Sequence, residues 1–334
     1  MKRFLFVIGA FLVAAAGCDR EPCAVCAEEN ALHHVSLQLA GSSRQTKVLD
    51  VPSLSESNVV RSTLYVFDRT GTLVDSYRST DGRFDFYLTD ETYDFVAVAN
   101  KGDLPEHDVT KSGLLASVTT LAENAVGNFV MVGRLDGRRI DSDENLTLEV
   151  ARRVAKVSYT VRTAFPPDLS AAGFRVEEIY LTNVAGSCTL DDAEGSPAEA
   201  AVWYNKMDLE GTAAAESPYG LLSGSIGRML AQGEVLASGH VFYPYPNAAA
   251  DSHDKQQWGS RCTRFVVKAV LGGRTTWYPV TLEEVRSNRH YHIDLTVSNY
   301  GVEHPEDPMT DYSAARASVS AAAWESGGDI DGNY

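Results

Sequence analysis

The residue whose surroundings most clearly predict a chemical reaction is Cys18. It follows Ala15-Ala16-Gly17, and a short basic start precedes an uninterrupted run of apolar and small residues from position 4 to position 16. The run is too short to span a bilayer and suits the core of a signal peptide. Small residues directly before a cysteine resemble the bacterial lipobox. We therefore expect residues 1–17 to be a lipoprotein signal peptide and Cys18 to carry an N-terminal diacylglycerol and a fatty acyl group. The alternative is an ordinary secretory signal beside an incidental cysteine.

The remaining four cysteines fall into two pairs with different expected chemistry. Cys23 and Cys26 form a Cys-x-x-Cys pair within the polar stretch of residues 18–30, which we expect to be a lipidated flexible tether. A local disulfide is the better expectation there, because the catalytic-dithiol interpretation belongs to cytosolic βαβ proteins. Cys188 and Cys262 either pair in an oxidising compartment or remain separate core thiols.

Two further patterns suggest metal binding and fail on inspection. His290 and His292, at positions i and i+2, point from the same face of a strand, but no third ligand can be named. Two ordinary histidines are the simpler interpretation. Residues 141–145 begin like a calcium loop, yet Leu146 stands where glycine is needed and Arg152 where a bidentate glutamate is needed. We expect a polar turn there and no metal site.

Composition and missing motifs narrow the function further. The chain lacks the short motifs of phosphate loops, zinc peptidases, dinucleotide sites and serine hydrolases. We therefore assign no catalytic residue, expect no cofactor beyond the lipid, and expect a protein that is not an enzyme. The net charge of −16, without a long basic run, argues against nucleic acid as a partner. Loss of residues 1–17 would make the charge more negative, so membrane attachment would depend on the lipid.

The elements that position these residues are predicted to be mostly strands. Phe84, Phe86 and Leu88 alternate with polar residues, which is typical of a half-buried strand. Similar segments recur at short intervals along the chain, among them residues 59–88, 93–99, 146–165, 174–184, 239–245, 263–271, 275–282, 290–298 and 317–324. Helical spacing occurs at residues 110–121 and, more weakly, at 223–230. The pattern predicts an all-β chain with minor helix, folded as antiparallel sandwiches.

A change of phase locates a domain boundary. Apolar side chains occupy even positions in residues 146–150 and odd positions in residues 157–161. One flat strand cannot do this without turning its core face outward. A bulge or a strand that passes between domains would explain the slip, and one long strand buried on both faces is the alternative. We expect an N-terminal domain at residues 31–152 and a C-terminal domain at residues 153–334. The length of the chain, 334 residues, suits two domains.

Several stretches together resemble a known family. They are Leu64–Asp68, Gly71–Val74, Thr92–Asn100, Arg152–Val157, Phe242–Asn247 and Tyr278–Asp294. In this order, and together with Cys18, they resemble the FimB/Mfa2 family of fimbrial anchor lipoproteins, within the type V pilin superfamily. The likeness covers most of residues 59–300. It does not distinguish an anchor from a shaft or tip pilin of the same superfamily, which is the alternative.

The resemblance implies a fold, a place and a way of assembling. It implies two tandem transthyretin-like β-sandwiches, lipid-anchored at the surface of the outer membrane at the base of a fimbrium. It implies fimbrial subunits as partners, joined by exchange of β-strands. Shaft members of the superfamily lose an N-terminal segment by cleavage after an arginine, and Arg44 and Arg61 are the positions here where such a cut would fall. An anchor must remain uncut to stay joined to its lipid.

The two ends of the folded chain are the candidate exchanging strands. One segment carries Leu32, with Val35, Leu37 and Leu39 on one side, and the other carries Val319, Ala321 and Ala323. We expect the first to stay in its own domain and the second to contact the first fimbrial subunit. Routine edge strands that complete their own sheets are the alternative for both.

A different class of function also fits a surface β-sandwich lipoprotein. A glycan-binding protein should display exposed aromatic side chains, for which Trp203, Trp258 and Trp277 are the candidates. Packing in the core is the simpler use of each of these rings.

Overall fold

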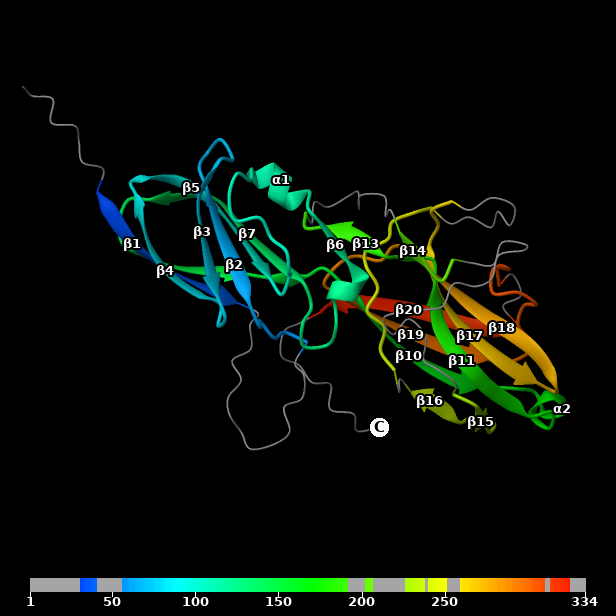
Figure 1. Cartoon of the computed structure of the whole chain (residues 1–334). Coiled ribbons are helices and arrows are strands. Elements are labelled where there is room, and N and C mark those ends of the chain that lie inside the picture. The colour runs from blue at the N-terminus through cyan, green and yellow to red at the C-terminus, as the bar shows by residue number, and fades with distance from the viewer. Residues whose placement is uncertain are drawn as a thin grey trace, which may run out of the picture.

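A computed structural model describes residues 31–40, 56–191, 202–206, 226–237, 240–250, 259–309 and 313–324. The described chain forms two β-sandwiches arranged end to end, with the N-terminal strands at one end and the C-terminal sandwich at the other (Figure 1). The expected signal peptide, the tether with Cys18, Cys23 and Cys26, and Arg44 lie outside the described residues.

The N-terminal sandwich pairs a three-stranded sheet with a five-stranded sheet. The smaller sheet has the order β4 (Arg83–Thr89), β1 (Leu32–Ala40), β8 (Glu144–Glu149). The larger has the order β3 (Leu73–Ser79), β2 (Ser62–Phe67), β5 (Glu91–Ala99), β7 (Met131–Ile140), β9 (Ala151–Arg152). The alternation expected around Phe84 is present, since β4 buries every second residue.

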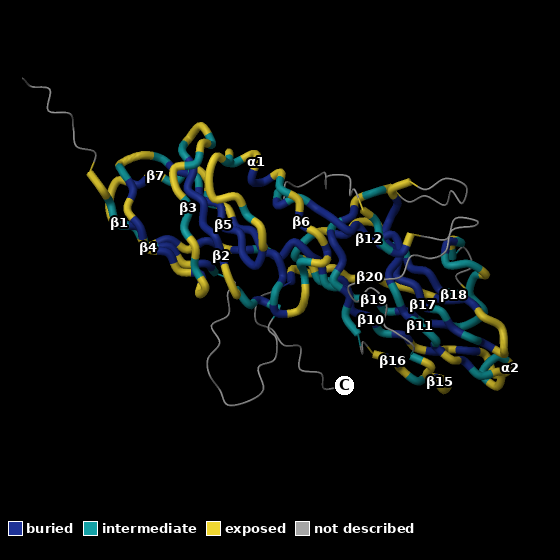
Figure 2. Tube along the Cα trace, viewed as in Figure 1, coloured by how far each residue is buried: buried dark blue, intermediate teal, exposed yellow. Residues whose placement is uncertain are grey.

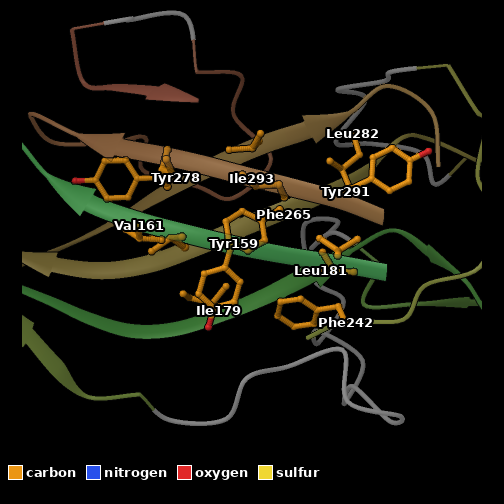
Figure 3. Close-up of a cluster of buried hydrophobic side chains, with 14 of the residues drawn as sticks. Tyr159, Val161, Ile179, Leu181, Phe242, Phe265, Tyr278, Leu282, Tyr291 and Ile293 are labelled. Atoms are coloured by element: carbon orange, nitrogen blue, oxygen red, sulfur yellow. The ribbon is translucent and has the colours of Figure 1, made fainter. Parts of the chain in front are cut away.

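The C-terminal sandwich consists of two four-stranded sheets. One has the order β16 (Val235–Ala237), β10 (Lys156–Thr163), β19 (Arg289–Val297), β20 (Ala315–Ala323). The other has the order β15 (Arg228–Leu230), β11 (Phe174–Thr182), β17 (Thr263–Leu271), β18 (Arg274–Leu282). Their facing side chains form one apolar core, in which the rings of Tyr159 and Phe265 lie 5.3 Å apart (Figure 3).

The β17–β18 hairpin illustrates how sequence specifies register. Leu271 pairs with Arg274 across a two-residue turn, Gly272-Gly273. Both glycines have positive φ, +56° and +81°, which the tight turn between twisted strands requires. The nine pairs of this hairpin place Phe265 and Val267 opposite Val280 and Tyr278, which fills the core from both strands.

Several contacts join the two sandwiches. The chain leaves the N-terminal sheet at β9 and enters the C-terminal sheet at β10. A two-stranded sheet between the sandwiches pairs β6 (Val118–Thr120) with β13 (Ser187–Thr189). Leu190, just after β13, is fully buried in a cluster of N-terminal side chains that includes Tyr65 and Phe67. A second small sheet, β12 (Val184–Ala185) with β14 (Trp203–Tyr204), extends the same region.

Three local expectations are wrong for identifiable reasons. The helix expected at residues 110–121 is limited to α1 (Lys111–Leu115), because the β-branched residues that follow pair with β13 and precede a 3₁₀ turn at Leu121–Glu123. The described part of the helix expected at residues 223–230 is coil and then β15. The strand expected at residues 239–245 forms a single bridge at Phe242, since prolines at 244 and 246 cannot donate to a ladder. A short α2 (Pro167–Ser170) is the other described helix.

The buried face of β1 provides a test of the N-terminal core. Leu37 is 1% exposed, whereas Leu32 on the same strand is 66% exposed. We expect Leu37→Ala to lower the free energy of unfolding by about 2–5 kcal/mol because it leaves a cavity. Leu32→Ala should change it by less than about 0.5 kcal/mol. Urea denaturation of both variants measures the difference, and equal effects would contradict the position assigned to β1.

Candidate interaction sites at the first and last strands

The first strand occupies the middle of its sheet. β1 pairs antiparallel with β4 and parallel with β8, so both of its edges are hydrogen-bonded. Val35, Leu37 and Leu39 are at most 1% exposed and pack in the N-terminal core, whereas Leu32 lies outside it. Three of the four candidate residues therefore form a continuous buried row. The segment stays within its own domain in this structure.

Arg61 lies where a cut would require hydrogen bonds of the backbone to break. It is exposed and comes directly before β2, but its carbonyl oxygen accepts a hydrogen bond from the backbone N–H of Asn100 at 2.9 Å. The Asn100 side chain also accepts from the N–H of Val60 at 2.8 Å. A protease needs an extended segment free of such pairing on both sides of the cleaved bond. Of the two candidate arginines, the geometry argues against Arg61.

This geometry predicts resistance to limited proteolysis. We expect trypsin to leave the bond after Arg61 intact under native conditions, because cleavage there requires the start of β2 to detach. Asn100→Ala removes the side-chain bond to Val60 and should increase cutting at Arg61. Mass spectrometry of the fragments over time measures both rates. Rapid native cleavage after Arg61 in the unmutated chain would refute the prediction.

The last strand is an edge strand with both faces uncovered. β20 pairs with β19 over nine residues, and within the described residues no strand pairs with its other side. Every residue of β20 after Ala315 is exposed (Figure 2). Val319 and Ala321 lie opposite Ile293 and Tyr291, which are core residues of β19. The odd-numbered side chains of β20 after Ala315 thus lie on the core-facing side of their sheet, but the opposing sheet does not cover them.

A groove runs beside this row. It has a volume of about 580 Å³ and lies between the end of β18 and the inner face of β20. Its lining combines apolar and charged residues: Thr281, Leu282, Glu283, Glu284, Arg286, Arg289, Tyr291, Val319 and Ala321. Natural edge strands are commonly protected by lysine, proline or a bulge. β20 has one charged residue, Arg316, and neither proline nor bulge, so its edge is open to pairing.

Trp324, the residue directly after β20, lies in a cluster of buried polar and aromatic groups. Trp324 is 6% exposed, and the Arg152 guanidinium lies 4.2 Å from the centre of its ring. Arg152 donates to the Trp324 carbonyl at 3.3 Å and to the Asn288 side chain at 3.0 Å. It also donates to the Glu56 carbonyl at 2.9 Å and to the Ser57 hydroxyl at 2.9 Å. We call these groups, with Lys156 and Tyr243, the Trp324 cluster.

Glu56 is the acidic member of the Trp324 cluster. Its carboxylate accepts from Tyr243 at 2.6 Å, from the Trp324 indole at 3.0 Å and from Lys156 at 2.9 Å. Burial alone would raise the pKa of Glu56, but the hydrogen bonds from Tyr243 and Lys156, the Lys156 charge and the indole bond together hold the pKa below its usual value. The cluster thus ties the segment ahead of β2 to the end of β20. Sequence reasoning missed it, because nothing local marks Glu56 as a partner of residues so distant.

The depressed pKa of Glu56 gives a stability change with a defined sign. A lowered pKa in the folded state stabilises the protein at pH values above the usual value of 4.5, and this contribution is lost as the pH falls through the folded-state pKa. Glu56→Gln should therefore destabilise the protein at neutral pH. The difference in melting temperature between variant and parent should shrink on acidification. Glu303→Gln, at an exposed ion pair with Arg274, is the control and should show no such trend. A difference independent of pH would contradict the assignment.

Other candidate residues do not assemble into a site. His290 and His292 both contact the Ser158 hydroxyl at 2.8 Å, and no group of three metal-binding side chains occurs in the described part of the chain. Cys188 and Cys262 are buried and form no disulfide with each other, so the pairing alternative is wrong. Trp203 and Trp277 are partly buried, Trp203 against the core, and Trp258 lies outside the described residues. No described helix is long and apolar enough to cross a membrane.

Comparison with known proteins agrees with this architecture. The model of a family described as fimbrillin-A associated anchor proteins Mfa1 and Mfa2 matches residues 46–216. A fimbrilin from Porphyromonas gingivalis is similar in structure, with a TM-score of 0.65 and 15% identity over 87% of this chain and 97% of that one. The tip fimbrial protein Mfa3 from the same organism, truncated at its C-terminus, gives a TM-score of 0.51 and 15% identity over 88% and 100%. No curated protein matches in sequence. The expected tandem sandwich fold is confirmed.

Proposed function

Because the chain belongs to the family of fimbrillin-A associated anchor proteins Mfa1 and Mfa2, we propose that it is the lipid-anchored subunit that attaches and ends a fimbrium at the outer membrane. The family is one of structural fimbrial proteins of the cell surface. The lipid on Cys18, the basal position and the strand-mediated contact are the parts that the proposal adds.

The observation that carries the proposal is the central position of β1 in its sheet. A subunit inside a fibre needs two complementary interfaces, one toward each neighbour. In this chain the middle position of the three-stranded sheet is filled by the chain's own first strand, with Val35, Leu37 and Leu39 buried. Among the described residues, neither sheet of the N-terminal sandwich therefore has a vacant position between two strands. The open edge of β20 remains as the place for one neighbour, and a subunit with one such interface ends the fibre.

The same arrangement suits a lipid tether. β1 begins at Leu32, fourteen residues after Cys18, so the expected tether leads directly into a buried central strand. Durable membrane attachment needs more than one acyl chain, which a diacylglycerol together with an amide-linked fatty acid supplies. A cut between β1 and β2 would break the covalent path from the lipid to the rest of the chain. The proposal therefore requires the chain to stay whole.

Replacing the lipidated residue tests the anchoring. We expect Cys18→Ala to move most of the chain from the outer-membrane fraction, with a fall of at least tenfold in the membrane-bound amount. Fimbriae should then be shed into the medium. Fractionation and immunoblotting measure both changes. Cys23→Ala, five residues away in the same polar stretch, is the matched control and should leave the chain at the membrane.

The native N-terminus distinguishes an anchor from the other fimbrial roles. Mass spectrometry of the chain purified from its host should find a lipidated Cys18 on an uncut polypeptide. A chain that begins after Arg44 or Arg61 would instead indicate a polymerising shaft or tip subunit, and the anchor proposal would fall.

A further inference from the structure

We propose that β20 stays in its own sandwich and that the partner adds a strand to its outer edge, so that the chain accepts a strand at this end and does not donate one. This rests on the proposed function, because it gives the direction of the contact with the first fimbrial subunit. The two directions make opposite demands on β20. A donated strand must leave β19, whereas an accepting strand must remain bound to it.

β20 is held along its whole length. Each of its nine residues pairs with β19. At its start, the Ala314 carbonyl accepts from the N–H groups of Ser298 at 2.8 Å and Asn299 at 3.0 Å. At its end, the N–H of Trp324 donates to the Asn288 carbonyl at 3.2 Å. Release of the strand would break the ladder and both terminal contacts.

The Trp324 cluster makes release costly at the C-terminal end. Departure of β20 would pull Trp324 out of a site where it stacks on Tyr243 and lies edge-on to Phe129. It would also remove the Trp324 carbonyl and ring from the buried Arg152 guanidinium, which is 2% exposed. A buried charge that loses its partners is strongly destabilising. The cluster therefore favours the seated strand.

The side chains of β20 are also poor material for filling a groove elsewhere. A donated strand must replace apolar volume in its neighbour. β1 shows what such a position needs, since Val35, Leu37 and Leu39 are all large and buried. The corresponding row of β20 is Ala317, Val319, Ala321 and Ala323, in which three of the four residues are alanines with a single methyl group as side chain. In a slot of the β1 type these alanines would leave cavities.

The free edge, by contrast, is ready for pairing. The bonds of β19 to Ala314 and Trp324 show that even-numbered residues of this segment bond to β19. Because bonded and non-bonded positions alternate in an antiparallel pair, the N–H and C=O groups of odd-numbered residues point to the outer edge. Val319 and Ala321 therefore present backbone groups outward and side chains toward the groove of about 580 Å³. The occupant that fits is an extended segment of a fimbrial subunit, free of proline, with large apolar side chains at alternate positions.

A covalent lock on β20 tests the direction. Asp294 and Ser318 lie opposite each other in the middle of the β19–β20 pair, and neither lines the groove. Both are even-numbered, so their side chains lie on the face of the sheet away from the core. Hydrogen-bonded pairs of this kind bring Cα atoms to about 5.5 Å, within the range for a disulfide. The double variant Asp294→Cys with Ser318→Cys is expressed in the native host in place of the parent chain. The readout is the cell-attached fraction of the host's major fimbrial subunit against the fraction shed. We expect the locked protein to retain fimbriae within twofold of the parent, like each single variant.

Two edge variants test the acceptance. Ala321→Pro removes an outward N–H while leaving the bonds to β19, and proline is tolerated on edge strands. Val319→Lys places a charge in the groove. Each should lower the cell-attached fraction at least tenfold, whereas Ala322→Ser should not, because Ala322 bonds to β19 and its side chain lies on the face away from the groove. Melting temperatures show whether each variant is folded. If Ala321→Pro does not fold, Val319→Lys alone tests whether the edge of β20 accepts a strand.

The outcomes separate the inference from the proposed function. Retention by the locked protein with loss in the edge variants supports acceptance at β20. Loss of fimbriae in the locked protein alone shows that β20 must leave β19, which overturns the inference and keeps the C-terminal contact. No effect of any variant places the contact elsewhere, and overturns both the inference and the use of β20 in the proposed function.

Discussion

The buried guanidinium of Arg152 is the interaction on which the arrangement of this chain depends. A buried cation is tolerated when its donors are satisfied, and the donors of Arg152 reach the Glu56 carbonyl, the Ser57 hydroxyl, Asn288 and the Trp324 carbonyl. Burial lowers the pKa of Arg152, and the nearby Glu56 charge opposes that shift. Arg152 also ends β9, the last strand of the N-terminal sandwich. The Arg152 side chain thus connects three places: the segment before β2, the last strand of the first sandwich and the residue after β20.

The sandwiches are joined by more than this residue. β6 and β13 pair across the space between them, and Leu190 fills the N-terminal side with its side chain. Arg134 on β7 forms an ion pair with Asp191 at 2.9 Å. These contacts come from a segment of the C-terminal half that reaches back over α1. The polar cluster at Arg152 and the apolar contact at Leu190 therefore lie at separate points of the junction, and two separate points of attachment limit rotation between the halves.

Local patterns in the sequence predicted the strands, and long-range pairing decided what they do. The alternation of Phe84, Phe86 and Leu88 identified a half-buried strand, and the odd-numbered apolar row of β1 was visible in the same way. That β1 lies parallel to β8, more than a hundred residues away, has no local signal. The helix expected at residues 110–121 ended early because its second half had a strand partner at β13. The Trp324 cluster combines residues from five distant parts of the chain. Pattern reasoning could therefore identify strands, but it could not show that these five parts meet.

The central position of β1 has a mechanical consequence. β1 lies at one end of an elongated molecule, and β20 lies in the other sandwich (Figure 1). Tension between a membrane at the first end and a fibre at the second would act along β1. The ladder bonds to β4 and β8 are roughly perpendicular to that direction and would be strained together in shear, where an edge strand pulled sideways would lose them one after another. A strand clamped on both sides and loaded lengthwise is a geometry that resists extraction.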